Sequence, residues 1–193
     1  MKKQIVLIGG GGHCRSIIDV IEQEGKFEIV GIVDKKDSLG LSILGYEIIA
    51  DDSDLLLLAK QYQYAFIAIG QIKTAELRIK LFTSVELAGF SIPSIISPRA
   101  YISNYSSIEK GTIVMHDAVI NANSSVGKNC IINSKSLIEH DVKVEDHCHI
   151  STGAIINGGS SIGRESFIGS GSVIREGLEL NSNSFIKAGS VGK

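Results

Sequence analysis

The sequence has no tryptophan, two prolines and three cysteines among its 193 residues. The cysteines, Cys14, Cys130 and Cys148, are odd in number and form no C-x-x-C pair, which argues against a disulfide or zinc framework and favours a reducing compartment. No long run of Lys or Arg accompanies the formal charge of −2, so nucleic acid is not an expected partner. No apolar run approaches the roughly 18 residues of a membrane span. We therefore expect a cytoplasmic protein without a membrane span.

Glycine and apolar residues, in contrast, are plentiful. Hydrophobic residues make up 44% of the sequence, which is enough for one sizeable core or two small ones. The 21 glycines, beside so few prolines, indicate many tight backbone turns. The composition therefore predicts a folded protein that is rich in turns.

Residues 1–96 alternate between strand-like and helix-like segments. The strand-like segments are 4–9, 28–34, 64–70 and 92–96, and the helix-like segments are 13–25, 51–61 and 74–89. Such alternation implies a small parallel sheet that is covered by helices through right-handed crossovers. We predict an α/β, Rossmann-like domain over residues 1–96.

A period of six residues begins at Tyr101. In successive six-residue blocks the second residue is Ile, Val or Leu fifteen times in a row, from Ile102 to Ile186. The sixth residue is small in nearly every block, and the fifth is often Gly, Asn or Asp. A large inward residue, a small corner residue and a turn-tolerant neighbour describe one side of a triangular solenoid.

This pattern resembles the hexapeptide repeat of the left-handed parallel β-helix acyltransferases, in which three hexapeptides form one coil. The resemblance implies an all-β domain over residues 97–193. Residues 18 apart are then expected to stack at roughly the 4.8 Å spacing of neighbouring strands. Cys130 and Cys148 are such a pair, and we expect them to fill a corner of the core rather than to act in redox chemistry.

One histidine has the surroundings of a catalytic base. Acyl transfer from a thioester needs a base, a group that orients the base, and donors for the developing oxyanion. His140 lies between Glu139 and Asp141, and either carboxylate could hold the imidazole tautomer. Gly158 stacks on His140 one coil further, where it permits close approach of a ligand and could present its backbone N–H to a thioester oxygen. A solvated outward histidine is the plainer interpretation.

Two other histidines are weaker candidates. His116 and Asp117 occupy the same place in their hexapeptide as His140 and Asp141, but the separation of 24 residues is not a multiple of 18. The two pairs therefore lie on different faces of the solenoid. His147 belongs to a third face, and we expect it to be a surface residue.

Four parts of the chain together identify a narrower family. They are the run Ile8-Gly9-Gly10-Gly11-Gly12-His13, Asp34 at the end of the second strand, Ala68-Ile69-Gly70 at the end of the third, and Ile138-Glu139-His140-Asp141 followed by His149. Across almost the whole chain these features closely resemble the sugar O- and N-acyltransferases of the sialic-acid and bacillosamine type. The resemblance implies that acetyl-CoA is the co-substrate.

The same resemblance implies roles for individual residues. In this family the residue matching His140 is the general base, the residue matching Asp141 orients it, and the residue matching His149 lies beside the acceptor and the acetyl group. The active site lies between adjacent subunits of a homotrimer. Acetyl-CoA runs along the coils near the residues that match Gly158, Ser170 and Ala188.

The glycine-rich loop at the start of the chain resembles an anion cradle. A strand that enters Gly9–Gly12 and then a helix turns free N–H groups and a helix dipole toward a phosphate. The G-x-G-x-x-G pattern fails because Cys14 or Arg15 stands where glycine is required, which disfavours a nicotinamide cofactor and an oxidoreductase. The resemblance implies instead a nucleotide-linked sugar held by residues Gly11, Gly12, His13, Asp34, Lys35 and Gly70. A loop that only turns strand into helix remains the alternative.

We predict an acetyltransferase that acts on the 4-amino group of a nucleotide-linked deoxyamino sugar in bacterial glycan biosynthesis, with neither a covalent acyl-enzyme nor a metal. O-acetylation of a sialic-acid-like sugar and a non-catalytic solenoid that binds sugar nucleotides remain as alternatives. A β-helix hydratase of the γ-carbonic-anhydrase type requires a His-x4-His pair for zinc. No two histidines in this sequence differ by five positions, so that class is disfavoured.

Overall fold

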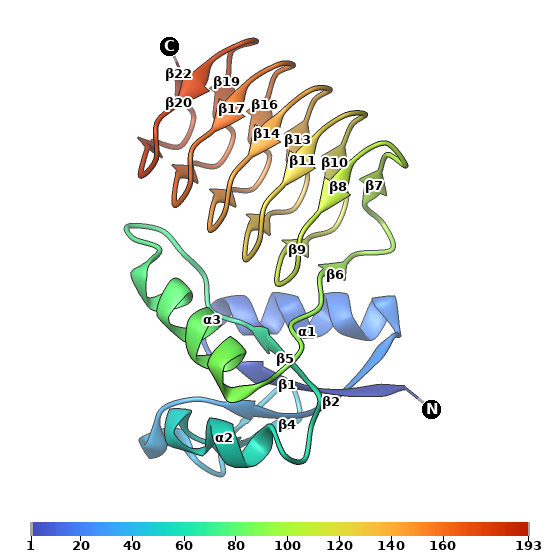
Figure 1. Ribbon diagram of the computed structural model, residues 1–193, viewed down its shortest axis with the longest axis vertical. Helices are drawn as coiled ribbons and strands as arrows, with labels where there is room; N and C mark the ends of the chain where they lie inside the picture. The colour runs from blue at the N-terminus through green and yellow to red at the C-terminus, as the bar shows by residue number, and fades with distance from the viewer. Residues whose placement is uncertain (1, 193) are drawn as a thin grey trace. The chain divides into compact units, whose positions relative to one another are not determined.

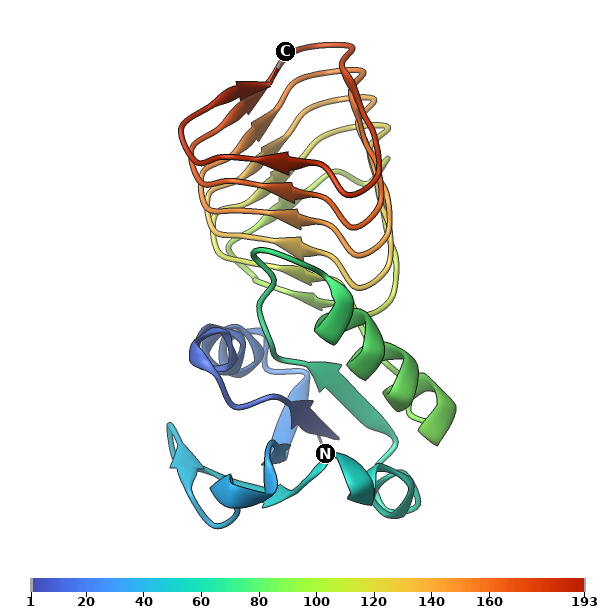
Figure 2. The same ribbon diagram turned by 90° about the vertical axis from the view of Figure 1, so that its left-hand side faces the viewer.

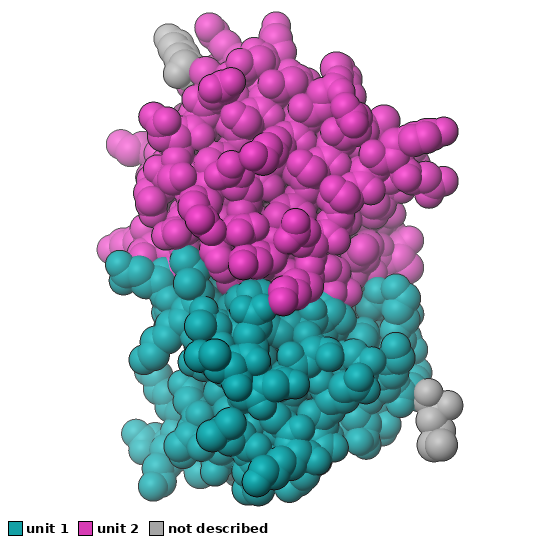
Figure 3. Space-filling model, viewed as in Figure 1, with its two compact units in different colours: residues 1–70, 76–93 teal, residues 71–75, 94–193 magenta. Residues whose placement is uncertain are grey.

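The computed structural model describes residues 2–192, which fall into two compact units (Figure 3). Unit 1 consists of Met1–Gly70 and Glu76–Pro93, and unit 2 consists of Gln71–Ala75 and Ser94–Lys193. No helix within residues 2–192 combines the length and the apolar character needed to cross a membrane. Each unit has its own buried core.

Unit 1 is built on a five-stranded sheet with the strand order β3-β4-β2-β1-β5 (Figure 1). The strands are β1 (Lys3–Ile8), β2 (Phe27–Val33), β3 (Ser42–Ile43), β4 (Tyr46–Ala50) and β5 (Tyr64–Ile67); the helices are α1 (Gly12–Glu24), α2 (Leu55–Leu58) and α3 (Glu76–Ala88), with short 3-10 turns η1 (Lys36–Ser38) and η2 (Asp52–Asp54). All strand pairs are parallel except β3 with β4. The predicted Rossmann-like sheet is therefore confirmed.

Helix α1 illustrates how the sequence forms these elements. One face of the helix is apolar and buried, with Ile17, Ile18 and Ile21 among its core residues. The helix ends at Gly25, whose φ of 70° lies in the left-handed region and whose N–H bonds the carbonyl of Ile21 at 3.0 Å. Glycine adopts this conformation without the steric cost of a side chain.

Two predicted elements of the first half are corrected, and one hairpin was not predicted. This hairpin joins β3 and β4, and its two turn residues, Leu44 and Gly45, both have positive φ. In place of the helix predicted at 51–61 the structure has the short turns η2 and α2. Within the predicted strand 92–96, only Ile95–Ile96 forms a strand, and it pairs with the β-helix of unit 2 because the six-residue repeat already begins there.

Unit 2 is a three-sided β-helix with strands of two residues each (Figure 1). The strands are β6 (Ile95–Ile96), β7 (Tyr101–Ile102), β8 (Ser107–Ile108), β9 (Ile113–Val114), β10 (Val119–Ile120), β11 (Ser125–Val126), β12 (Ile131–Ile132), β13 (Leu137–Ile138), β14 (Lys143–Val144), β15 (His149–Ile150), β16 (Ile155–Ile156), β17 (Ser161–Ile162), β18 (Phe167–Ile168), β19 (Val173–Ile174), β20 (Glu179–Leu180), β21 (Phe185–Ile186) and β22 (Val191–Gly192). Consecutive strands lie on consecutive sides, so three of them complete one coil.

The strands form three parallel sheets, and the coils stack directly on one another (Figure 2). We name the sheets by their outward residues: the apolar face (β22-β19-β16-β13-β10-β7), the polar face (β20-β17-β14-β11-β8) and the aromatic face (β21-β18-β15-β12-β9-β6). Partners in neighbouring strands are 18 residues apart, as in Leu137 with Ile155 and His149 with Phe167. The predicted stacking of residues one coil apart is confirmed.

The repeat positions have the predicted roles. The second residue of each strand points into the coil, and in the central coils these residues are almost completely buried, for example Ile138, Ile150 and Ile156. Cys130 and Cys148 are unpaired and buried at corners of this core. Every fifth position of the hexapeptides from Gly111 to Gly189 has a positive φ, which explains the preference for Gly, Asn and Asp there.

One corner residue corrects a prediction. Expected at the surface, His147 is buried, with 6% of its area exposed. Its Nδ1 lies 2.9 Å from Asn129 Nδ2 one coil away, and its carbonyl accepts a hydrogen bond from Gln71 Nε2 at 3.0 Å. Gln71 lies 76 residues earlier in the chain, so the repeat pattern contains no sign of this contact. Burial lowers the pKa of the His147 imidazole.

Acidification is expected to destabilise the protein through His147. The folded protein lowers the pKa of this imidazole from its ordinary 6.5, mainly through burial, despite opposing attraction from Asp146. The neutral form therefore stabilises the fold at higher pH, and this contribution is lost as the pH falls below 6.5. His147→Asn should reduce the fall in melting temperature between about pH 7.5 and about pH 5.5. An equally steep fall in the variant would contradict the assignment.

Replacing Ile150 with Asp should unfold the β-helix. Ile150 is fully buried, and even an uncharged polar group without a partner costs roughly 2–7 kcal/mol in such a place. Ser161→Asp, at an outward position of β17, is the matched control and should melt like the wild-type protein. Circular dichroism during heating measures both variants. A soluble Ile150→Asp variant with an unchanged melting point would refute the inward assignment.

Candidate active site

His140 lies in the turn that follows β13, at the corner between the apolar and polar faces. Its side chain is 67% exposed, and its Nδ1 lies 2.7 Å from Asp141 Oδ2. An ionised carboxylate can only accept, so Nδ1–H donates to Asp141. This tautomer leaves the lone pair of Nε2 available to take a proton from a reacting group.

The structure pairs the imidazole with Asp141 and not with Glu139. Asp141 Oδ1 accepts a hydrogen bond from Asn123 Nδ2 at 2.6 Å, while Oδ2 faces His140. The hydrogen bond from Asn123, followed by that from His140, lowers the pKa of the Asp141 carboxyl. Glu139 instead accepts a hydrogen bond from Asn121 at 2.8 Å. The choice between the two flanking carboxylates is thus made by side-chain geometry.

Gly158 provides space for the imidazole of His140. A Cβ atom at this position would lie 2.7 Å from Cε1 and 2.9 Å from Nε2 of His140. The space that we expected for a ligand is therefore filled by the ring itself. Within residues 2–192 no backbone carbonyl accepts the amide N–H of Gly158.

The second His-Asp motif has a different arrangement. Asp117 forms an ion pair with Arg99, whose Nη2 lies 2.7 Å from Oδ2, and the Nδ1 of His116 lies 2.7 Å from Ser97 Oγ. The Asp117 carboxylate is thus bound by Arg99 at both oxygens, whereas the Asp141 carboxylate is bound by Asn123 and His140. That this second motif is the weaker candidate for catalysis stays a prediction.

His149 lies on a different face from His140. It is the outward residue of β15 on the aromatic face, is only 7% exposed, and packs edge-on against Phe167 with ring centroids 5.2 Å apart. Its Nδ1 donates to the carbonyl of Gln71 at 2.6 Å, and its Nε2 accepts from Asn133 Nδ2 at 3.2 Å. The ring is thus held in one neutral tautomer. Gln71 and Asn133 were not predicted as partners because neither lies a multiple of 18 from His149.

The residues expected near acetyl-CoA lie at two corners. Ser170 and Ala188 are in the turns after β18 and β21, one coil apart, where the aromatic face meets the apolar face. Ser170 Oγ lies 2.9 Å from Ser151 Oγ, and the Ser170 carbonyl accepts from the N–H of Gly189 at 2.9 Å. Gly158 lies at the other end of the apolar face, beside His140. One chain does not bring these two groups together.

Unit 1 gathers its predicted residues at the carboxyl ends of β1, β2 and β5. Asp34 Oδ2 accepts the N–H of Gly10 at 3.0 Å, and Oδ1 accepts the N–H of Lys35 at 2.8 Å, so this carboxylate holds the glycine loop in place. Gly70 follows β5 and lies against His13, since a Cβ at Gly70 would be 3.6 Å from the Cβ of His13.

The first turn of α1 faces open space. A Cβ added at Gly11 or Gly12 would meet no atom within 4 Å, and Gly11 caps the helix without a side-chain hydrogen bond. The amide groups of such a turn are donors suited to an anion. Ligands of open α/β sheets bind at this edge, outside the carboxyl ends of the strands.

Sequence reasoning missed one residue beneath this edge. Arg78 of α3 is 1% exposed, and its Nη1 donates to the carbonyls of Ile67 at 3.1 Å and Ile69 at 2.7 Å, just before Gly70. The signal was available, because Arg78 lies on the same helical face as the buried Leu81 and Val85. A buried guanidinium that binds carbonyl oxygens stabilises the local backbone.

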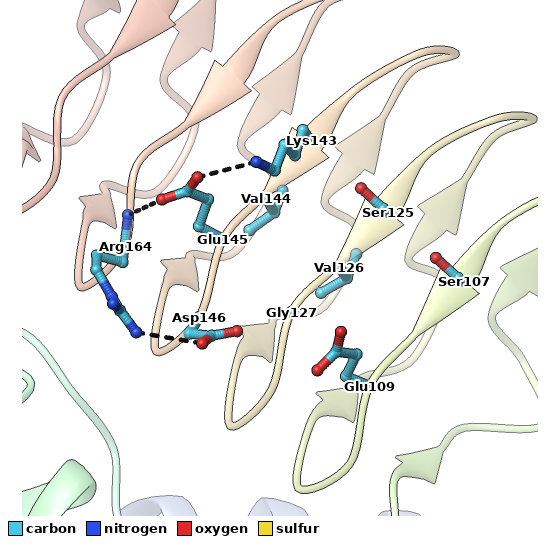
Figure 4. Close-up of a pocket in the computed structure, with 10 residues that line it drawn as sticks. All are labelled: Ser107, Glu109, Ser125, Val126, Gly127, Lys143, Val144, Glu145, Asp146 and Arg164. Carbon is cyan, nitrogen blue, oxygen red and sulfur yellow. Dashed lines mark hydrogen bonds and ion pairs between the residues drawn. The ribbon is translucent and has the colours of Figure 1, made fainter.

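A separate trough of about 280 Å³ lies on the polar face (Figure 4). Its ion pairs join Lys143 to Glu145 at 3.0 Å and Arg164 to Asp146 at 3.2 Å. None of the predicted site residues lines the trough. Among the residues described, no group of three His, Cys, Asp or Glu is arranged to hold a metal ion.

Two protein-family models match the chain. The PglD N-terminal domain matches residues 4–85, and the hexapeptide repeat of succinyl-transferase matches residues 124–157 and 160–191. Among curated proteins, none matches the chain.

Solved structures resemble the chain over nearly its full length. A histidine mutant of perosamine N-acetyltransferase from Caulobacter crescentus, in complex with CoA and GDP-perosamine, is 31% identical with a TM-score of 0.93, and the match covers 98% of this chain and 88% of that one. The acetyltransferase domain of PglB from Neisseria gonorrhoeae, in complex with acetyl coenzyme A, is 26% identical with a TM-score of 0.86, over 100% and 97% of the two chains. The chain belongs to the hexapeptide-repeat sugar acyltransferase family, with a PglD-type N-terminal domain and a left-handed β-helix.

Proposed function

We propose that this protein transfers the acetyl group of acetyl-CoA to the 4-amino group of a nucleotide-linked deoxyamino sugar, in the biosynthesis of bacterial glycans. The main support is the exposed His140–Asp141 pair beside Gly158, in a chain that is 31% identical to a perosamine N-acetyltransferase studied with CoA and GDP-perosamine. O-acetylation of a sugar hydroxyl is the alternative, because the same base could serve it.

His140 would act as the general base. Nε2 takes a proton from the sugar amine as the nitrogen attacks the thioester carbonyl, and the Asp141 carboxylate stabilises the imidazolium that forms. The amide N–H of Gly158, which no backbone carbonyl within residues 2–192 accepts, would be a donor for the oxyanion of the tetrahedral intermediate. When the intermediate collapses, the C–S bond breaks and the imidazolium returns its proton to the thiolate of CoA. The products are the amide and free CoA.

Direct transfer without an acyl-enzyme agrees with the state of the cysteines. Cys14, Cys130 and Cys148 are all buried, so none presents a nucleophile to a thioester. Burial raises the pKa of the Cys14 thiol to about 12, which keeps it protonated. Three reduced thiols also support a cytoplasmic location.

The nucleotide of the acceptor would bind to unit 1. The open first turn of α1 at Gly11 and Gly12 offers amide donors to phosphate, and Lys35 offers a positive charge. His13 and Gly70 border the same edge of the sheet. Asp34 would contribute through the glycine loop, since its two oxygens bond the N–H groups of Gly10 and Lys35.

A homotrimer would complete the site. The apolar face presents outward side chains of which two, Tyr101 and Val191, are more than half exposed. Its outward residues are Tyr101, Val119, Leu137, Ile155, Val173 and Val191. Exposed apolar patches of this kind favour contact with another subunit. A second copy against this face would bring the corner with Ser170 and Ala188, and His149, toward His140 of the first.

The proposal is tested by following the release of CoA thiol from acetyl-CoA with UDP-, GDP- and dTDP-linked 4-amino sugars, with sialic acid as the hydroxyl control. Release with one amino sugar is the expected result and identifies the nucleotide. Release with sialic acid alone would move the assignment to O-acetylation. Sugar-nucleotide binding without any CoA binding would indicate a non-catalytic protein.

His140→Ala should reduce turnover by roughly 10²- to 10⁴-fold, because the amine loses its base, and should leave the affinity for CoA nearly unchanged. His116→Ala is the matched control, since His116 has the same place in its hexapeptide but its neighbour Asp117 is bound at both oxygens by Arg99. A His140→Ala enzyme that keeps more than about a third of the wild-type rate would remove His140 as the base.

Gly158→Ala should lower turnover by about 10²-fold, the cost of displacing a reacting group by about 1 Å. The new Cβ would lie 2.7 Å from His140 Cε1, so the exposed ring must move. The backbone of Gly158 does not have a positive φ, and the melting temperature should therefore stay close to that of the wild type. Wild-type kinetics in this variant would show that the position of the ring is unimportant.

A further inference from the structure

We infer that Asn123 is a positioning residue, which fixes the Asp141 carboxylate so that it holds the Nδ1–H tautomer of His140. Asn123 lies one coil before Asp141 and occupies the same left-handed corner position, with φ values of 60° and 61°. Its Nδ2 donates to Asp141 Oδ1 at 2.6 Å, and Oδ2 of the same carboxylate faces His140 Nδ1 at 2.7 Å.

The Asp141 side chain needs such support because it is exposed. Its side chain is 52% exposed, and exposed charged pairs gain little from attraction alone, since water competes and the side chains must be ordered. With one oxygen bound by Asn123 and the other by His140, the carboxylate cannot rotate without losing a hydrogen bond. Backbone hydrogen bonds also hold Asn123 and Asp141 in place. The N–H of Asn123 donates to the Tyr105 carbonyl at 3.2 Å, and the N–H of Asp141 donates to the Ala122 carbonyl at 3.1 Å.

The second His-Asp motif shows what another residue does at this position. The residue one coil before Asp117 is Arg99, which donates to both carboxylate oxygens: to Oδ1 at 3.2 and 3.0 Å and to Oδ2 at 2.7 Å. Both oxygens of Asp117 are therefore engaged by the arginine. Asn123 has a single short donor and occupies one oxygen, which leaves the other for the histidine.

The hydrogen bond also affects charge. It is the largest cause that lowers the pKa of the Asp141 carboxyl, and an ionised carboxylate accepts only. An accepting partner at Nδ1 leaves Nε2 as the basic nitrogen of the ring. The position of Asn123 thus bears on which nitrogen of His140 receives a proton.

The test uses Asn123→Gly, which keeps a residue suited to positive φ, and Asn123→Arg, which puts an arginine one coil before Asp141 as Arg99 stands one coil before Asp117. The control is Asn121→Ala, because Asn121 bonds Glu139 across the same two coils without contacting His140.

Nitrogen NMR of the His140 ring reports the tautomer, and kinetics separate kcat from KM. In both Asn123 variants the Nδ1–H fraction should fall and kcat should decrease roughly 10-fold, with the KM for acetyl-CoA within about twofold of wild type. Asn121→Ala should match wild type.

A wild-type tautomer in Asn123→Gly, or an equal loss in Asn121→Ala, would overturn the inference. If Asn123→Gly has a lower melting temperature than the wild type, the tautomer of His140 is measured in Asn123→Asp instead. Aspartate keeps the shape of asparagine and replaces the Nδ2 donor with an oxygen. The expected fall in kcat rests on the proposed acetyl transfer, whereas the tautomer of His140 is measured without substrate. A wild-type protein that releases no CoA would therefore refute the proposed function, whereas a change of tautomer alone would still support the role of Asn123.

Discussion

Backbone hydrogen bonds between successive coils are the interaction on which the second half of this protein depends. Most of them join residues 17 or 19 apart in the sequence, such as the Ile113 N–H with the Cys130 carbonyl and the Asp141 N–H with the Ala122 carbonyl. Each coil of unit 2 contributes only two-residue strands, which are stable because strands above and below them supply the missing partners. The inward aliphatic side chains stack through the coils into one hydrophobic core, and their burial from water stabilises the coils together. Residues that share a position in the repeat are therefore direct neighbours in space.

The candidate site is built from these vertical neighbours. Asn123, Asp141 and the His140–Gly158 pair are all related by one step of the coil, so their contacts follow from the backbone ladder rather than from a flexible loop. Asn123 and Asp141 both occupy left-handed corner positions in turns that the ladder holds in place. The side chain of His140 is exposed and is still held in orientation by Asp141.

The two units contribute different chemistry. Unit 1 offers amide donors at the carboxyl ends of a parallel sheet, with Asp34 and the buried Arg78 holding the backbone there. Unit 2 places the His140–Asp141 pair on one edge of its apolar face and the turns of Ser170 and Ala188 on the other.

The amino-acid sequence by itself determined the alternating first half, the β-helix, the inward residues and the stacking of His140 on Gly158. These features follow from periodicity, because a constant six-residue step decides both direction and neighbour. Only the tertiary structure decided that Asp141 and not Glu139 holds the imidazole, and that the ring fills the space beside Gly158. It also decided that Gln71 contacts both His147 and His149, and that Arg78 binds the backbone at the carboxyl end of β5. These contacts depend on side-chain directions and on segments far apart in the chain, which no local pattern encodes.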